Sequence, residues 1–319
     1  MMTIFDFEKP INELESAIAE LRQLATEKGL DRSREIAELE AQRERLLRQI
    51  FAHLRPWDKV LLARHPKRPY ALDYIRLMCE SFIELHGDRL GYDDPAVVAG
   101  LAKMGGRNLV IVGQQKGRDL KERQKRNFAM AKPEGYRKAM RMFRLAEKFR
   151  LPVLTLVDTP AADPGVESES RGISEAIAQS MLTLFELTVP TVAVILGEGG
   201  SGGAIALAAT NRVLMLEHAI YSVIPPEGCA AILHRDPNKA PQAADALKLT
   251  AESALALGLI DMIIPEPLGA AHRDPQTTAL SVRAAVLQQL DELGAMSPDA
   301  LRDHRYQRFR AMGVFETVG

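Results

Sequence analysis

The fold of this chain is decided by the stretch Thr191-Val-Ala-Val-Ile-Leu-Gly-Glu-Gly-Gly-Ser-Gly-Gly-Ala-Ile-Ala-Leu-Ala-Ala209. Thr191–Leu196 is a β-branched, apolar run typical of a buried strand, and residues 203–209 favour a helix. Backbone N–H groups at the start of a helix have no partner inside it, and the positive end of the helix dipole lies behind them. Because glycines let a ligand approach the backbone, the turn from Gly197 to Gly203 predicts a site for a phosphate or an oxyanion.

The glycine turn by itself leaves several functions open. The glycines could serve only to pack the helix tightly on a sheet. Dinucleotide binding is disfavoured by the spacing, and a Walker loop is excluded because no Lys-Ser or Lys-Thr follows. A serine hydrolase is the main rival, because Gly199 to Gly203 satisfies G-x-S-x-G with Ser201 as nucleophile. Asp261 and His272 are the downstream acid and histidine that such an enzyme would use.

A second loop follows the preceding strand. Val153–Val157 runs through Asp158 into Thr159-Pro160-Ala161-Ala162-Asp163-Pro164-Gly165. Two adjacent parallel strands that each open into such a loop can converge on one crevice. One N–H group from each loop would then make a two-point oxyanion hole, which stabilises the enolate of a thioester.

The remaining chain alternates between strands and helices. Further short apolar runs predict strands at 97–101, 109–112 and 213–216, and helices are expected at 136–149 and 174–187. Apolar residues at helical spacing over 11–55, with Gly29 and Asp31 between two runs, predict a helical hairpin. Residues 281–293 and 299–309 are expected to be helical again. The predicted fold class is therefore α/β, with a mainly parallel sheet and helical ends.

The composition and net charge of the chain disfavour several classes of function. The chain has 319 residues, of which 46% are hydrophobic and 26% charged, and its formal net charge is -1. Nothing in this balance points to nucleic acid or to a membrane surface. The chain has only two cysteines, Cys79 and Cys229, which argues against a disulfide framework and against a structural zinc site in this chain. The N-terminus does not read as a signal peptide and no apolar run could span a bilayer, so we expect a cytoplasmic protein.

Several segments together resemble one family, the acetyl-CoA carboxylase carboxyltransferase α subunits of bacterial type. The resemblance runs in order from about Asp6 to Arg308 and is carried by these segments: Arg64-His65-Pro66, Arg68-Pro69-Tyr70, Gln115-Lys116-Gly117-Arg118, Arg126-Asn127-Phe128, Pro133 to Ala139, Asp158-Thr159-Pro160, Gly197 to Ala204, Tyr221 to Ile224, Pro226 to Ala230, Ile264 to Gly269 and Arg305 to Arg308. No single motif is unique to the family, but the ordered set is very specific.

The resemblance implies a crotonase-like (ClpP/crotonase) spiral of β-β-α units with helical N- and C-terminal extensions. It divides the chain into a helical hairpin (1–65), a carboxyltransferase core (66–270) and a C-terminal helical segment (271–319). The implied reaction moves a carboxyl group from carboxybiotin on a carrier protein to acetyl-CoA, giving malonyl-CoA. The implied partners are a zinc-containing β subunit in an α2β2 assembly, the biotin carboxyl carrier protein and, in the wider complex, biotin carboxylase. No cofactor is expected to be bound covalently to this chain, and no metal.

By position, the resemblance assigns the donor role to Gly202 and Gly203. Gly199, Gly200 and Ser201 complete the turn, with Ser201 as a turn residue, while Pro160, Ala161 and Ala162 form a supporting wall. The candidates for contacts with CoA or the carrier are Lys116, Arg118 and Arg126, although a solvated helix face explains this basic segment equally well. The lone histidines are not expected to be catalytic; they are His65, His86, His218 and His234.

Departures from the family cluster at the loops. The family usually reads Asp-Thr-Pro-Gly-Ala-Tyr-Pro-Gly at the second loop, where this chain has Ala161 and Asp163. The other departures are Glu167, Ser168, Ser170, Ile173, Pro225, Ala231, His234 and, in place of histidine, Gln114. Ala161 restricts φ, and Asp163 adds a charge beside a site for developing negative charge. The clustering suggests a specialised paralogue that acts on another acyl-CoA or carrier, and a non-catalytic scaffold subunit remains a further alternative.

Overall fold

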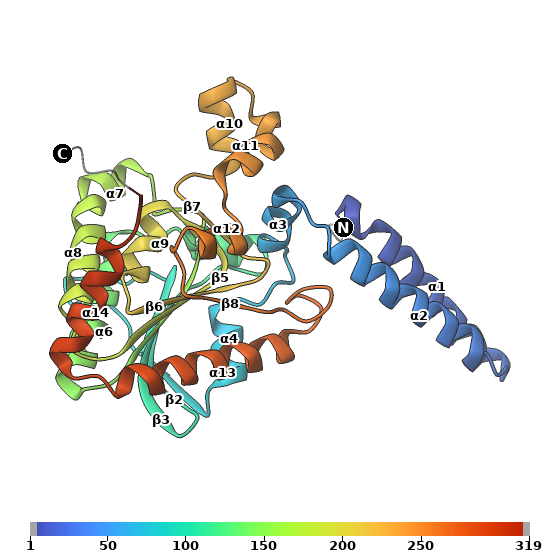
Figure 1. Ribbon diagram of the computed structural model, residues 1–319, viewed down its shortest axis with the longest axis horizontal. Coiled ribbons are helices and arrows are strands. Elements are labelled where there is room, and N and C mark those ends of the chain that lie inside the picture. The colour runs from blue at the N-terminus through green and yellow to red at the C-terminus, as the bar shows by residue number, and fades with distance from the viewer. Residues whose placement is uncertain (1–4, 315–319) are drawn as a thin grey trace.

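An eight-stranded sheet forms the centre of the molecule in the computed structural model, which describes residues 5–314 (Figure 1). The strand order is β1-β2-β3-β4-β5-β6-β8, and β7 pairs with the end of β5. The strands are β1 (Ser81–Glu84), β2 (Val97–Met104), β3 (Arg107–Gln114), β4 (Val153–Thr159), β5 (Thr191–Gly200), β6 (Arg212–Leu216), β7 (Ile220–Ser222) and β8 (Met262–Ile264).

The sheet is mixed, with its parallel part at the centre. β1, β2 and β3 form an antiparallel meander, whereas β3 to β6, β7 and β8 pair in parallel. All five strands expected from the apolar runs are present, and the α/β class is confirmed. β4 and β5 are apolar and buried along nearly their whole length, as strands covered on two faces must be.

Helices pack on both faces of this sheet. α8 contacts both α6 and α9, while α4 contacts α13. A Cβ on Gly113 would meet Ala71 of α4, whereas the next side chain, Gln114, reaches Gly203 of α9. Because successive strand residues face opposite sides, α4 and α9 lie on opposite faces. The helices of this core are α3 (Pro56–Ala63), α4 (Ala71–Met78), α5 (Leu120–Lys125), α6 (Pro133–Phe149), α7 (Val166–Ser170), α8 (Ile173–Glu186), α9 (Ser201–Ala208) and α12 (Ala251–Ala256).

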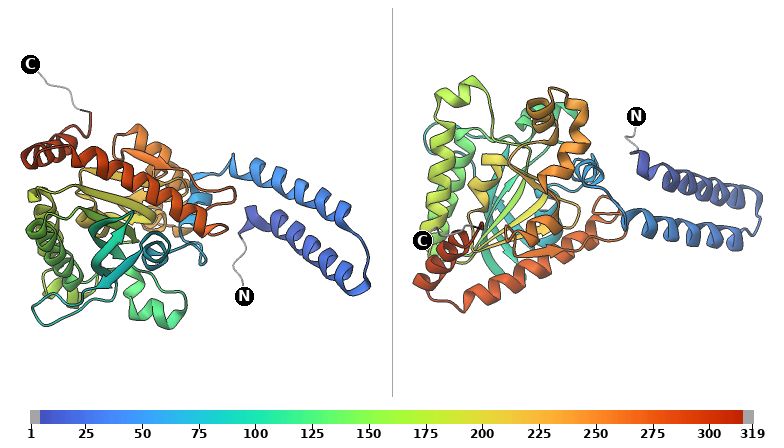
Figure 2. Two further views of the ribbon diagram at one scale, coloured as in Figure 1. Left: turned by 90° about the horizontal axis from the view of Figure 1, so that it is seen from below. Right: turned by 45° about the horizontal axis from the view of Figure 1, so that its top comes forward.

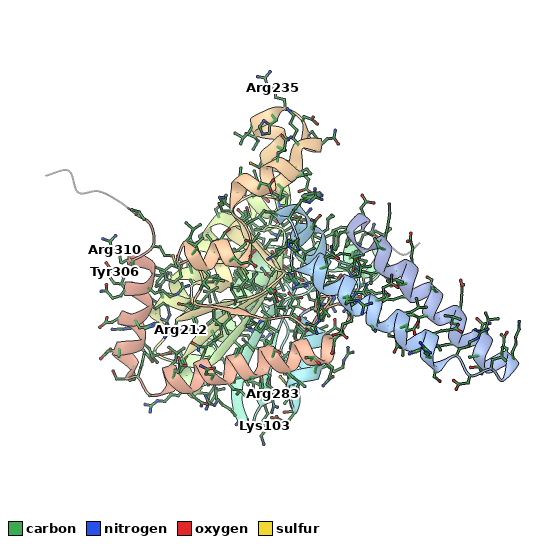
Figure 3. The ribbon with its side chains drawn as sticks, turned by 45° about the vertical axis from the view of Figure 1, so that its right-hand side comes forward. Lys103, Arg212, Arg235, Arg283, Tyr306 and Arg310 are labelled. Atoms are coloured by element: carbon green, nitrogen blue, oxygen red, sulfur yellow. The ribbon has the colours of Figure 1, made fainter. Side chains whose placement is uncertain are left out.

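Two helical pairs project from the core. The predicted N-terminal hairpin is α1 (Lys9–Lys28) and α2 (Ser33–Phe51), joined at Gly29, whose φ of 61° suits glycine; it extends well away from the sheet (Figure 2). The second projection is α10 (Pro226–His234) and α11 (Ala240–Leu247), with Arg235 at its tip (Figure 3). Three short 3-10 turns complete the elements before α13: Asp6–Glu8, Asn127–Ala129 and Pro237–Lys239.

The chain ends in two helices that return to the core. α13 (Pro275–Gly294) and α14 (Pro298–Arg310) confirm the helical end expected from the sequence. The Arg305 guanidinium on α14 is fully buried and donates to the Leu187 carbonyl at 3.0 Å and to Asn211 Oδ1 at 2.7 Å. The division of the chain at residues 65 and 270 stays a prediction. Within residues 5–314 no helix is long and apolar enough to cross a bilayer.

The glycine segment differs from its predicted form. Gly197 to Gly200 continue strand β5, and α9 begins at Ser201. The reason is pairing on both sides: Thr159 pairs with Gly199, and Glu198 to Gly200 pair in parallel with β7. Only residues 201–203 therefore form the turn of the helix. Sequence periodicity could not show this, because β7 lies about twenty residues later in the chain.

Candidate functional site

The two predicted loops meet at backbone contact. A Cβ atom on Gly200 would overlap the Pro160 carbonyl, and one on Gly203 would lie 2.6 Å from the Ala161 carbonyl carbon and 2.7 Å from the Ala162 nitrogen. No side chain fits at either position, so glycine is required by contact between loops. The predicted convergence of the two strand ends is therefore present in the structure.

Backbone donors gather at the start of α9. Ser201, Gly202 and Gly203 form its first turn, where N–H groups have no intrahelical acceptor. Within residues 5–314, neither the Gly202 nor the Gly203 N–H donates to another segment. Ser201 has a φ of 48°, in the left-handed region, and this bends the chain sharply from strand into helix. The turn thus presents unpartnered donors at the positive end of a short helix.

A largely apolar cavity opens beside this turn. Its volume is about 340 Å³, and it is lined by Ser201, Gly202, Ile205, Ala208, Val213, Tyr221, Ser222, Val223, Leu259, Arg308, Phe309 and Met312. The sequence does not predict that α14 reaches the site. The segment Arg305 to Arg308 is part of the family resemblance, and nothing in its local pattern shows that it lies near Ser201. Next to apolar side chains a backbone donor interacts more strongly with an anion than it would in bulk water.

A buried charged cluster lies on the other side of the turn. Lys116 Nζ is 2.8 Å from Asp158 Oδ1 and 2.7 Å from Glu198 Oε2, and Arg64 also pairs with Glu198 at 2.7 Å. A recess of about 180 Å³ lined by Arg64, Tyr70, Lys116, Arg123, Phe128, Pro160 and Glu198 opens here. Burial alone would lower the pKa of Lys116, but the charges of Asp158 and Glu198 outweigh it and raise that pKa. The charged Lys116 side chain therefore links β4 to β5 through its ion pairs with Asp158 and Glu198.

The other two basic candidates are also held within the chain. Arg118 donates to the Arg68 carbonyl at 2.9 Å, pairs with Asp73 and stacks over the Tyr70 ring at 4.1 Å. Arg126 donates to the Pro95 carbonyl at 2.9 Å and pairs with Glu122 at 3.1 Å. A role for Lys116, Arg118 and Arg126 in binding CoA or a carrier stays a prediction, and each of the three side chains is already held by other groups of this chain.

The Gln114 side chain forms hydrogen bonds to a backbone group near each of the two loops. Its Nε2 donates to the Gly203 carbonyl at 2.7 Å, and its Oε1 accepts from the Asp158 N–H at 3.1 Å. The Asp158 carboxylate in turn accepts from the Glu198 N–H at 2.9 Å. The sequence singled out Gln114 only as a departure from the family. Gln114 ends β3, next to the end of β4. This position is the signal that could have linked Gln114 to the second loop.

The residues of the hydrolase alternative are not brought together. Asp261 accepts from the Val213 N–H at 2.7 Å and from Arg308 Nε at 3.0 Å. His272 lies 3.2 Å from Glu8. Within the described chain, no hydrogen bond joins Ser201 to any histidine, and no histidine lines the cavity beside Gly202. Ser201 therefore lacks the base that a serine nucleophile needs.

One cluster has potential metal ligands. Glu8, His65 and His272 offer ligand atoms that all lie within 4.8 Å of one another. The two imidazole rings are tilted against each other, with centroids 3.9 Å apart and planes 31° from parallel. Arg273, 3.7 Å from Glu8, adds a positive charge, so the cluster favours packing of the N-terminus over metal binding.

Two of the residues that depart from the family, Asp163 in the second loop and Ser168 in α7, form a hydrogen bond with each other. Ala161 is not in the left-handed region, so the alanine adds no backbone strain. The Asp163 carboxylate accepts from Ser168 Oγ at 2.5 Å and from Asn127 Nδ2 at 3.0 Å. Burial would raise the pKa of Asp163, but these hydrogen bonds from Ser168 and then Asn127 keep it below its ordinary value. Asp163 and Ser168, two of the departures, are thus partners in one local network.

Comparison with known proteins gives a match along almost the whole chain. Residues 4–313 match the family described as "Acetyl co-enzyme A carboxylase carboxyltransferase-like". The acetyl-coenzyme A carboxylase carboxyl transferase subunit α of Zymomonas mobilis is 54% identical over 313 residues, which cover 98% of this chain and 100% of that protein. The protein of the same name from Thermus thermophilus is 54% identical over 310 residues, covering 97% of this chain and 98% of the relative.

Solved structures show the same fold at low identity. A transcarboxylase 12S structure has a TM-score of 0.58 and 21% identity, covering 72% of this chain and 42% of that one. A Pseudomonas malonate decarboxylase hetero-tetramer has a TM-score of 0.60 and 17% identity, covering 75% of this chain and 94% of that one. These likenesses confirm the crotonase-like fold, and at such identity they carry nothing more.

Proposed function

The chain belongs to the acetyl-coenzyme A carboxylase carboxyltransferase family, and from that premise we propose that its glycine turn stabilises the oxyanion formed during carboxyl transfer to acetyl-CoA. The chain is a carboxyltransferase α subunit, as its full-length relatives at 54% identity are named. The observation that carries the site assignment is that the Gly202 and Gly203 N–H groups have no partner within residues 5–314, and that Gly202 lines an apolar cavity.

The proposed reaction needs donors more than it needs a side-chain base. The Gly202 and Gly203 N–H groups bind the ureido oxygen of carboxybiotin, and the N–C bond to the carboxyl group breaks to release carbon dioxide. The electron pair stays on the ureido group, whose nitrogen takes the α-proton of acetyl-CoA. The enolate then attacks carbon dioxide and forms malonyl-CoA. The protein contributes positioning and fixed dipoles, which cost no reorganisation as charge develops.

The proposed site is one half of a shared one. The Ser201–Gly203 turn and the apolar cavity form the biotin-facing side, with the Pro160–Ala162 loop as the wall that holds Gly200 and Gly203 in place. A separate β subunit, carrying a four-cysteine zinc element, would bind the acyl-CoA in an α2β2 assembly. This chain has only two cysteines and cannot supply that element. The biotin carboxyl carrier protein brings the substrate, and biotin carboxylase recharges it.

A pair of variants at Gly202 tests the donor. A Cβ at this position meets the Ile177 side chain, with Cδ1 at 3.2 Å and Cγ2 at 3.8 Å, so Gly202→Ala keeps the N–H and fits after a small shift of a flexible side chain. Gly202→Pro removes the N–H at the second residue of α9, where no intrahelical hydrogen bond is lost. The complex with a β subunit is assayed by malonyl-CoA-dependent carboxylation of a biotin derivative. We expect Gly202→Pro to lower kcat about a hundredfold or more and Gly202→Ala to lower it less than about tenfold.

Two outcomes would contradict the proposal. If an assembled Gly202→Pro complex keeps kcat within about tenfold of the wild type, the Gly202 N–H is not a donor to the oxyanion. If the wild-type complex assembles but shows no exchange with any acyl-CoA, the chain is a scaffold. Activity with another acyl-CoA in place of acetyl-CoA would instead identify a specialised paralogue.

A further inference from the structure

The side chain of Gln114 spans the two halves of the proposed site. It is fully buried at the last position of β3, and its amide bonds one backbone group on each side. Nε2 donates to the Gly203 carbonyl at 2.7 Å, and Oε1 accepts from the Asp158 N–H at 3.1 Å. Gly203 lies in the first turn of α9, and Asp158 lies two residues before the Pro160–Ala162 loop.

The Asp158 N–H donates to a side chain and not to the backbone of a neighbouring strand. Pairing of β3 with β4 ends at Gly113 with Leu156, and the β4–β5 register shifts between Val157 and Thr159. An unpaired buried N–H is costly, so a side chain must accept from it where the ladder does not. The Gln114 amide does this at the point where the two central strands separate.

The Gly203 side of the bridge tolerates little movement. Its α-carbon packs against the Ala161 backbone, so that even a methyl group would lie 2.6 Å from the nearest atom. The Gln114 amide therefore fixes the Gly203 carbonyl relative to Asp158, and with it the orientation of the first turn of α9. The group at this position must accept one hydrogen bond and donate another. A neutral amide or a neutral imidazole can do both, whereas an alkyl or thioether side chain cannot donate.

We propose that Gln114 is a positioning residue for the carboxyltransferase reaction: its amide holds the Gly203 turn and the Pro160–Ala162 loop at the separation that aims the backbone donors at the oxyanion. This inference rests on the proposed function of Gly202 and Gly203. Gln114 does not touch substrate; it acts through Gly203 and Asp158.

A neighbouring glutamine gives a matched control. Gln115 is also buried, accepts from the Leu72 N–H at 2.9 Å and donates to the Lys116 carbonyl at 2.7 Å. It makes the same kind of bridge but on the α4 side, away from the Gly203 turn. Gln114→Met and Gln115→Met each remove a similar amide without changing side-chain volume much. Gln114→His restores one acceptor and one donor.

The experiment compares these three variants in the full complex with a β subunit. Each is checked for assembly and thermal unfolding, and kcat and KM for the acyl-CoA are measured at pH 8. We expect Gln114→Met to lower kcat about tenfold or more with KM changed less than about threefold, since the loss falls on the transition state. We expect Gln114→His to recover kcat to within about threefold of the wild type, and Gln115→Met to keep it within about threefold.

Other results would overturn the inference. If Gln114→Met assembles and keeps kcat within about twofold, or if both methionine variants lose kcat equally, the Gln114 amide does not position the site. Failure of Gln114→His to recover kcat while assembling normally contradicts the donor-and-acceptor requirement. If Gln114→Met does not assemble, the Gln114→His result decides alone. A loss in Gly202→Pro together with full activity in Gln114→Met would leave the oxyanion site standing and remove only the role of Gln114.

Discussion

The α-carbon of Gly200 lies so close to the Pro160 carbonyl that any side chain at this position would overlap its oxygen. The two residues come from the ends of adjacent strands, β5 and β4. This contact sets how closely the glycine turn and the second loop approach, and it leaves the donors of α9 no freedom to move toward the loop.

Gly200→Ala should therefore destabilise the protein. The methyl group can be accommodated only if the β4 and β5 ends separate, and overpacking of this kind costs about 2 kcal/mol or more. Gly202→Ala is the control, because its new Cβ faces the flexible end of Ile177 and alanine favours a helix. Thermal or urea unfolding of the two variants measures the difference. Equal stabilities would show that the Gly200–Pro160 contact is not a rigid constraint.

Ser201 should prove dispensable for the chemistry. Its hydroxyl has no histidine partner among the described residues, so a serine at this turn is not activated. We expect Ser201→Ala to keep kcat within about threefold of the wild type. A fluorophosphonate should leave the wild-type protein unlabelled. Labelling that disappears in Ser201→Ala would restore the hydrolase alternative.

The packing of the N-terminal segment should weaken in mild acid. Burial, with the nearby charge of His272 second, lowers the pKa of His65 to about 4 from an ordinary value of 6.5. An unfolded chain binds a proton at His65 below pH 6.5, while the folded chain resists protonation until about pH 4. The contribution of His65 to stability is thus fully present above pH 6.5 and declines as the pH falls toward 4.

Hydrogen exchange of the amides in residues 8–15 at several pH values between 7.5 and 4.5 measures this effect. His65→Asn keeps an acceptor for the Lys67 N–H, which His65 Nδ1 accepts at 3.2 Å, but cannot titrate. The variant should show a weaker pH dependence than the wild type. Identical pH dependence in the two proteins would mean that His65 does not control the docking of this segment.

The charge of Asp163 should matter little to catalysis. Its carboxylate is occupied by Ser168 and Asn127, so we expect Asp163→Asn to change kcat less than about threefold. Thermal stability should fall modestly, because one charged acceptor is lost, by about 1 kcal/mol. Ser168→Ala tests the same bond from the other side. A large change in acyl-CoA preference in either variant would instead tie these residues to specificity.

Local pattern predicted most of the secondary structure. The apolar runs at Thr191–Leu196 and Val153–Val157 are strands, and the spacing in residues 11–55 is that of the helical hairpin, because burial on one or two faces leaves a periodic trace in sequence. No periodic pattern in the sequence predicts the antiparallel pairing of β2 with β3, apart from the short turn between the two strands. The extension of β5 through Gly200 was missed because it depends on pairing with β7, a contact that local propensity does not encode.

The sequence by itself determined that Gly197 to Gly203 is a backbone-rich turn between a buried strand and a helix, and its ordered motifs determined the family. Only the tertiary structure decided at which glycines contact between the loops leaves no room for a side chain, that Gln114 bridges Asp158 and Gly203, and that Arg308 on α14 lines the cavity beside Ser201. The physical reason is the distance along the sequence between the residues that interact. Strand, turn and helix follow from interactions within a few residues, whereas the site is made by atoms from strand ends and a C-terminal helix that meet only when the sheet has assembled.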